Sequence, residues 1–148
     1  MKKCIFCKIV KGEIPCHTVY EDKKFLGLLD INPNTNGMTL VIPKKHYDSY
    51  VIKMPNKEYG ELMLTVKKVA KLIDKKLGVK RTALVMEGLG INHAHIKLYP
   101  LHGLKSSFVE TWAKKKIFFK KYQGYISTQL GPLARKKTLE RIAKKIRK

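Results

Sequence analysis

The sequence lacks any long hydrophobic run and any apolar segment near its start. No apolar stretch among its 148 residues approaches the ~20 residues that cross a bilayer, which excludes a membrane-spanning helix. Residues 1–8 alternate charged, thiol and apolar side chains and hold no signal-peptide core. We therefore expect an intracellular, cytoplasmic protein that does not engage a membrane.

Cysteine is also scarce, and there is no internal repeat or low-complexity linker. In an intracellular setting the three cysteines should be thiols or metal ligands rather than a set of disulfides. The length suggests one domain, and a hydrophobic content of 44% is enough for a real core.

Acidic residues are few. Eleven Asp and Glu face 32 Lys and Arg, which gives a formal net charge of +21. A charge of this sign and size attracts polyanions such as nucleotides, nucleic acid or an anionic membrane surface. Lysine enrichment is also typical of proteins from hot or salty habitats, where it gives a solvated cationic surface. The composition leaves both interpretations open.

Periodicity predicts an α+β fold with a largely antiparallel sheet. Short β-rich runs at residues 18–20, 25–29, 38–42 and 81–86 indicate strands, while residues 4–10 alternate only loosely before the turn at Lys11-Gly12. Residues 56–77 change period and predict a long helix that ends at Gly78. Its apolar positions recur at steps of three and four, at Leu62, Val66, Val69, Ile73 and Leu77.

The C-terminal third has a different composition. Residues 101–148 hold 14 Lys or Arg and two Glu, so they contribute +12 of the net charge. Aromatic residues alternate with lysines between Phe108 and Tyr125, and Gly131-Pro132 breaks the chain. Apolar residues at helical spacing then predict a basic terminal helix.

Residues 91–100 are the most informative segment for function. In a strand, successive side chains point to opposite faces. One face of this segment would carry His93, His95, Lys97 and Tyr99, and the other is mostly apolar. Two imidazoles, an ammonium and a phenol in a row can bind a metal, attack phosphorus or neutralise a phosphate.

Cys4 and Cys7 form a Cys-x-x-Cys pair, which can grip one Zn²⁺ and leave two tetrahedral positions to fill. Histidines are the obvious further donors, but spacing alone does not choose among the five in the chain. A redox pair shares the Cys-x-x-Cys spacing, although no βαβ pattern surrounds it here.

Long ordered motifs resemble the histidine triad (HIT) hydrolases, in the zinc-carrying branch. The resemblance covers residues 1–100 and rests on the segments 4–15, 19–22, 28–33, 37–46 and 93–100. It implies a half-barrel of antiparallel strands with one long helix, usually as a homodimer. We therefore expect a HIT domain at residues 1–102. A basic, aromatic extension at 103–148 would pack on or cover that domain.

The resemblance also implies a chemistry. Such enzymes bind a purine nucleotide and break a bond at its α-phosphorus, with the middle triad residue, here His95, as nucleophile. Four positions match the zinc ligands of relatives: Cys4, Cys7, His46 and His93. Four protein ligands leave no open position, so the expected zinc is structural.

Further positions match the nucleotide site of the resembled enzymes. Asp30 matches the carboxylate that binds the ribose hydroxyls, and Phe6, Leu28 and Ile31 match positions around the base. Ordinary core packing is the alternative role for the apolar residues among them. Gly90 belongs to the loop that touches the phosphate, and this loop is shortened here to Leu89-Gly90.

The sequence departs from the family pattern at three more positions, Met38, Met86 and Lys97. Lys97 stands where the third triad histidine is expected, and lysine keeps its charge but shuttles protons poorly near neutral pH. We interpret Lys97 as a catalytic residue that clamps the α-phosphate. The alternative is a solvated strand residue in a degenerate site.

Three functions follow from these observations. The first is a hydrolase or transferase that acts through a nucleotidyl-histidine on dinucleoside polyphosphates or adenosine phosphoramidates. The second is a nucleic-acid-end deadenylase that uses the basic tail to bind DNA or RNA. The third is a non-catalytic, zinc-stabilised nucleotide-binding protein.

Overall fold

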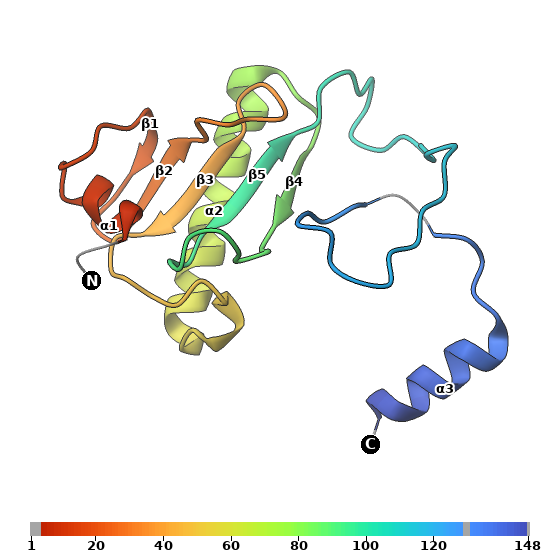
Figure 1. Cartoon of the computed structure of the whole chain (residues 1–148). Helices are drawn as coiled ribbons and strands as arrows, with labels where there is room; N and C mark the ends of the chain where they lie inside the picture. The colour runs from red at the N-terminus through yellow and green to blue at the C-terminus, as the bar shows by residue number, and fades with distance from the viewer. Residues whose placement is uncertain (1–3, 129–130, 148) are drawn as a thin grey trace. The chain divides into compact units, whose positions relative to one another are not determined.

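The computed structural model describes residues 4–128 and 131–147 of the chain. Two compact units make up the chain, Met1–Val109 and Glu110–Lys148. Every strand of the described residues belongs to the first unit (Figure 1). A division between a domain at 1–102 and an extension at 103–148 stays a prediction.

The first unit is an open antiparallel sheet with helices. In chain order it contains α1 (Ile5–Val10), β1 (Thr18–Glu21), β2 (Phe25–Leu29), β3 (Thr39–Pro43), the 3-10 helix η1 (Val51–Lys53), α2 (Asn56–Leu77), β4 (Thr82–Val85) and β5 (Ile96–Pro100). The strands lie in the order β1-β2-β3-β5-β4, and each neighbouring pair is antiparallel. The predicted α+β class is confirmed.

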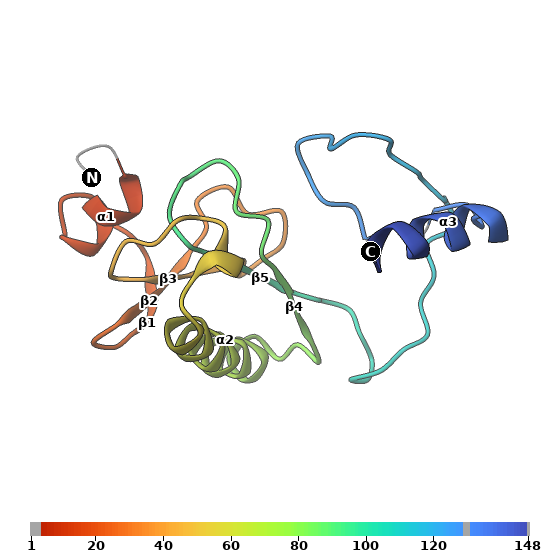
Figure 2. The same cartoon turned by 90° about the horizontal axis from the view of Figure 1, so that it is seen from below.

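Helix α2 covers one face of the sheet (Figure 2). Four of the five residues of its predicted apolar stripe are buried, with Leu62, Val66 and Val69 fully enclosed. Leu77, at the helix end, is 41% exposed. The buried side chains pack against Val41 of β3 and against Ile96 and Leu98 of β5. The helix ends at Leu77 because Gly78 adopts a left-handed conformation with φ of 65°, as a C-terminal glycine commonly does. Burial of this stripe fixes β5 against α2, between β3 and the edge strand β4.

The opposite face of the sheet is covered in part by α1. Phe6 of α1 packs with Leu26, Leu28, Leu40 and Ile42, all of them buried. The loose alternation at residues 4–10 did not indicate this helix. Its start is capped by a side chain, because the Cys4 Sγ accepts a hydrogen bond from the backbone N–H of Cys7 at 3.5 Å.

Two loops lie side by side on the end of the sheet that α1 also approaches. Ser49 N–H donates to the Asn92 side chain at 3.0 Å, and Ala94 N–H donates to the Tyr47 carbonyl at 2.9 Å. Gly88 brings the second loop close, since a Cβ there would stand 2.6 Å from the Ser49 carbonyl oxygen and its φ is +71°. These contacts place the segment after β3 beside the segment before β5.

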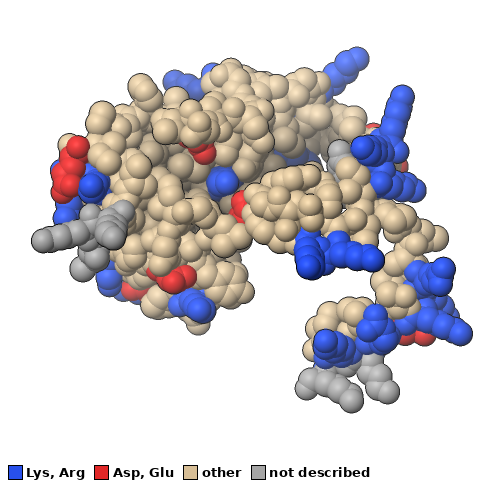
Figure 3. Space-filling view, in the orientation of Figure 1, with Lys and Arg blue, Asp and Glu red and all other residues tan. Residues whose placement is uncertain are grey.

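The second unit contains α3 (Lys136–Ile146), which confirms the predicted terminal helix. Lys and Arg side chains gather over α3 and the residues near it (Figure 3). Its apolar residues Leu139, Ile142 and Ile146 are all exposed, as are Trp112 and Phe118 earlier in the unit. Within the described part of the chain, no helix has the length and apolar character that crossing a bilayer requires.

Candidate active site and metal centre

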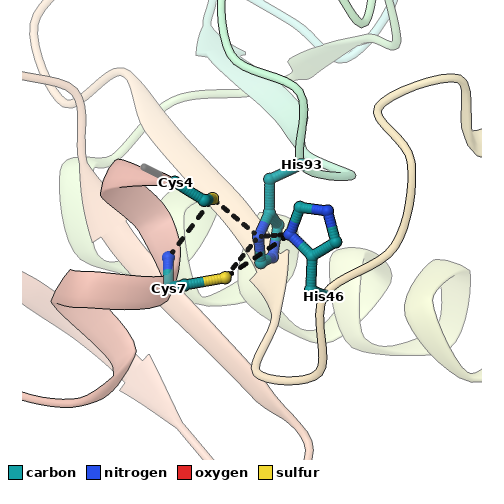
Figure 4. Close-up of side chains that lie close together, drawn as sticks. All are labelled: Cys4, Cys7, His46 and His93. Carbon is teal, nitrogen blue, oxygen red and sulfur yellow. Dashed lines mark hydrogen bonds between the residues drawn. The ribbon is translucent and has the colours of Figure 1, made fainter. Parts of the chain in front are cut away.

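Four side chains converge at the N-terminal end of α1 (Figure 4). Cys4 and Cys7 come from the cap and first turn of α1, His46 from the segment after β3, and His93 from the segment before β5. One donor atom from each residue lies within 4.8 Å of all the others. The two clasped loops therefore bring the histidines to the Cys-x-x-Cys pair, which spacing alone could not determine.

The donor atoms fit a tetrahedral zinc ion. The Cys4 Sγ to His93 Nδ1 and Cys7 Sγ to His46 Nδ1 distances are both 3.4 Å, and the two Nδ1 atoms are 3.2 Å apart. Zn–S bonds of about 2.3 Å and Zn–N bonds of about 2.05 Å at tetrahedral angles put sulfur and nitrogen about 3.6 Å apart and two nitrogens about 3.3 Å apart. These three distances lie within about 0.2 Å of the tetrahedral values.

A hydrogen bond at the second ring nitrogen of His93 orients the ring as a metal ligand. Its Nε2–H donates to the Pro43 carbonyl at 2.8 Å, which leaves the Nδ1 lone pair directed at the cysteines and His46. Burial lowers the pKa of His93, and although the bond to Pro43 opposes this, the charges of His46 and His95 lower it further. This shift favours the neutral ring, which is the form that binds a metal.

The two thiols need a cation if both are to ionise. Burial raises the pKa of Cys7, and the hydrogen bond and charge of Cys4 raise it further. A bound divalent ion removes this penalty because thiolates coordinate it directly. The cluster can hold a metal ion, and its sulfur and imidazole donors are those that zinc takes in structural sites.

His95 stands next to this cluster without belonging to it. Its side chain is 4% exposed, and its ring meets Phe6 edge-on at a centroid distance of 5.6 Å. Its Nδ1–H donates to the His93 carbonyl at 2.7 Å, so the free lone pair is on Nε2. An imidazole held in one orientation with a free ring nitrogen can act as a nucleophile.

The alternation predicted for residues 91–100 holds, although β5 begins only at Ile96. Ala94, Ile96 and Leu98 are fully buried against the α2 side. Phe6 touches both His93 and His95, so the two rings share the α1 side of the sheet. The residues just before Ile96 lie outside the strand. There the Ala94 N–H donates to the Tyr47 carbonyl, and the side chains of His93 and His95 belong to the site.

Lys97 and Tyr99 continue the row, and Glu87 joins it. Lys97 Nζ lies 3.6 Å from Glu87 Oε2, and the two side chains are only 25% and 12% exposed. Burial raises the pKa of Tyr99; the charge of Lys97 opposes this shift, while Glu87 and Asp30 add to it. These four charged or titratable groups therefore lie close together. The sequence analysis did not identify Glu87 as a site residue. Its position shortly after β4, the strand that pairs with β5, was the one feature that could have indicated it.

The residues predicted to bind the nucleotide differ from one another in burial and in hydrogen bonding. Phe6 and Leu28 are buried together beside His95, whereas Ile31 is 82% exposed. Asp30 uses Oδ1 to accept the Asn32 N–H at 2.8 Å, which fixes its carboxylate. Gly90 has φ of +92° and open space where a Cβ would be. The assigned roles of these residues at a nucleotide stay predictions.

Comparison with known proteins gives a family match for this chain. A family model described as the HIT domain matches residues 11–103. An uncharacterized HIT-like protein of Methanocaldococcus jannaschii is 44% identical over 102 residues, which are 66% of this chain and 78% of the relative. An adenosine 5′-monophosphoramidase of Saccharomyces cerevisiae is 33% identical over 124 residues, covering 80% of this chain and 75% of that protein.

A solved structure agrees with the fold and comes from a protein described as zinc-bound. A zinc-bound histidine triad family protein from Mycobacterium smegmatis superposes with a TM-score of 0.63 at 32% identity, covering 72% of this chain and 81% of that one.

Proposed function

Because this chain belongs to the HIT domain family, we propose that it cleaves nucleotides at the α-phosphate through a covalent nucleotidyl-histidine at His95. The observation that carries the proposal is the 2.7 Å hydrogen bond from His95 Nδ1–H to the His93 carbonyl. It commits the ring to one tautomer and directs the lone pair of Nε2 away from the metal cluster. The enzyme would then release a nucleoside monophosphate after attack by water, or transfer it to another acceptor.

The other residues would bind and orient the nucleotide. In this proposal, Asp30 accepts the ribose hydroxyls, and Phe6, Leu28 and Ile31 surround a purine base. Lys97 and the backbone of Gly90 lie along the phosphates. An oriented nucleophile beside fixed cationic and N–H donors is the arrangement that lowers the barrier to phosphoryl transfer. The substrates would be dinucleoside polyphosphates or adenosine phosphoramidates, and the protein would be a cytoplasmic homodimer.

Zinc held by Cys4, Cys7, His46 and His93 would be structural in this enzyme. When bound, the ion cross-links α1 to the two loops and provides charge for the thiolates. The chain's own residues do the rest: the His93 carbonyl orients His95, and the Pro43 carbonyl orients His93. The metal cluster and the nucleophile are thus connected by one residue.

Incubation with a panel of adenylated substrates tests this function. The purified protein should release AMP from at least one dinucleoside polyphosphate or phosphoramidate, as followed by chromatography, with saturation by substrate. Binding of AMP without turnover of any substrate would contradict the enzyme and favour the non-catalytic nucleotide-binding alternative.

A second function, binding of nucleic acid through the C-terminal unit, has its own support. Trp112, Phe118 and Tyr122 are 64%, 72% and 52% exposed, and lysines lie between them in the sequence. Exposed aromatic rings stack on bases, and neighbouring lysines neutralise phosphates. In this proposal the C-terminal unit supplies affinity for a nucleic acid, and an adenylated end of that nucleic acid is the substrate.

Salt dependence of binding checks the second function. The full chain should bind a single-stranded oligonucleotide with an affinity that falls steeply with salt, by about 0.7 logarithmic units per phosphate contact per decade of salt. Replacing Lys114, Lys115 and Lys116 by glutamine should flatten this slope. Replacing three exposed α2 lysines, Lys67, Lys71 and Lys75, removes the same charge and should change the slope less; equal effects would point to nonspecific attraction.

A further inference from the structure

Strand pairing fixes the face of the sheet on which Lys97 lies, in the row of side chains formed by His93, His95, Lys97 and Tyr99. Lys97 lies in β5 opposite Leu40 of β3 and Val85 of β4. Directly opposite residues of an antiparallel pair point to the same face. Leu40 packs in the same cluster as Phe6, whose ring touches His95. Lys97 and His95 therefore face the same side of the sheet.

Glu87 fixes the ammonium group of Lys97. The Nζ to Oε2 distance is 3.6 Å, and the lysine side chain is 75% enclosed by its surroundings, with 25% exposed. Partial burial reduces the screening of this ion pair by solvent. At 3.6 Å the contact is an ion pair rather than a short hydrogen bond, and the ammonium group has three N–H donors to offer a ligand.

We propose that Lys97, positioned by Glu87, makes this site selective for substrates whose leaving group departs as an oxyanion rather than as an amine. This inference rests on the proposed function and narrows its substrate class. Nucleotides joined to polyphosphate or sulfate belong to the favoured class. Nucleoside phosphoramidates belong to the disfavoured one.

The favoured reaction needs charge stabilisation but no proton. The His95 Nε2 lone pair forms a bond to the α-phosphorus, the phosphorus–oxygen bond to the leaving group breaks, and its electron pair stays on that oxygen. Lys97 donates a hydrogen bond to the oxyanion as negative charge develops on it. Water then forms a bond to the phosphorus of the nucleotidyl-histidine and gives one proton to solvent. The phosphorus–Nε2 bond breaks, its electron pair returns to His95 Nε2, and the nucleoside monophosphate leaves.

The disfavoured reaction needs a proton as well. When the phosphorus–nitrogen bond breaks, the nitrogen must gain a proton to leave as a neutral amine. A histidine at position 97 would exchange a proton near neutral pH, whereas an ammonium paired with a carboxylate provides a fixed charge. The lysine is therefore matched to one leaving-group class and mismatched to the other.

The test compares kcat/KM for substrates that share AMP and differ in the leaving group. Adenosine 5′-phosphosulfate and diadenosine tetraphosphate represent oxyanions, and adenosine 5′-phosphoramidate represents amines. The wild type should favour the oxyanion substrates. Lys97→Met should reduce their kcat by about 10²-fold with little change in KM, because the lost donor acts in the transition state. Lys97→His should shift the ratio toward the phosphoramidate by at least about tenfold.

Further variants separate charge from structure. Lys97→Arg keeps the charge and should keep the preference, even if the histidine variant folds poorly. Glu87→Gln should move the ratio in the same direction as Lys97→Met, which a purely structural role would not do. Lys44→Met removes another half-buried lysine, 27% exposed and paired with Glu21 at 2.6 Å, and should leave the ratio unchanged.

The outcomes distinguish the two proposals. If the wild type releases AMP and Lys97→His leaves the ratio unchanged, the selectivity proposal is overturned while the proposed function stands. A wild type that prefers the phosphoramidate also overturns the selectivity proposal alone. If no substrate releases AMP, both fail together.

Discussion

Replacing His95 by alanine should reduce kcat for AMP release by about 10⁴-fold or more, since removing a nucleophile abolishes its covalent pathway. Nucleotide affinity should change less than tenfold, because the proposed contacts of the base and ribose are made by other residues. The measurement is steady-state turnover together with AMP binding by calorimetry. Loss of turnover with binding retained is the signature of a group that acts on the reacting phosphorus.

His102 provides the matched control for this experiment. It is also a histidine whose ring is bonded to a backbone carbonyl, with Nε2–H donating to Asn36 at 2.8 Å, but it is exposed and outside the row. His102→Ala should keep nearly full turnover. If His95→Ala is as active as His102→Ala, the imidazole at position 95 is not the nucleophile.

Replacing Cys7 by serine should remove the bound metal and lower the free energy of unfolding by on the order of 4 kcal/mol or more. The physical reason is that one ion joins α1 to both loops, and a hydroxyl is a poor ligand for zinc at neutral pH. Elemental analysis should find one zinc per chain in the wild type and far less in the variant. Thermal unfolding should show a lower midpoint, and a chelator should lower that of the wild type.

Cys16 is the natural comparison for the metal. Its Sγ lies 3.4 Å from the Thr18 hydroxyl, and it is not part of the four-residue cluster. Cys16→Ser should keep the zinc content and most of the stability. Equal zinc content and equal midpoints in the Cys7 and Cys16 variants would show that no structural metal is held at the cluster.

The parts of the fold that depend on local periodicity could be predicted from the sequence. The residues of α2 repeat with the helical period over six turns, and Gly78 marks the end, so its bounds follow from local rules. The alternation after His93 likewise anticipates the apolar face that packs on α2. Both patterns arise because a single buried face selects the apolar positions.

The helix α1 could not be recognised in this way. It has only six residues, which is too few for a clear period, and it is capped by the Cys4 thiol rather than by a common capping residue. Its one buried residue, Phe6, packs on strands far along the chain. Tertiary contacts and the cluster at its start therefore define this helix.

The partner of Lys97 also lay beyond local rules. Glu87 reaches Lys97 only because β4 pairs with β5 in the register that sets Val85 opposite Lys97. A shift of register by one residue would turn the strand's side chains to the other face. The choice of His46 and His93 from five histidines came from the family resemblance, and the loop contacts around Ser49 and Tyr47 give its physical reason.

The most direct test of the account is to trap the covalent intermediate on the intact protein. After rapid mixing with an adenylated substrate and acid-free denaturation, mass spectrometry should find a fraction of the chain heavier by one adenylyl group. Peptide mapping should place that group on His95, and the adduct should be absent from His95→Ala. An adenylyl group on another residue, or turnover with no adduct under any quenching time, would contradict the nucleophile assigned here.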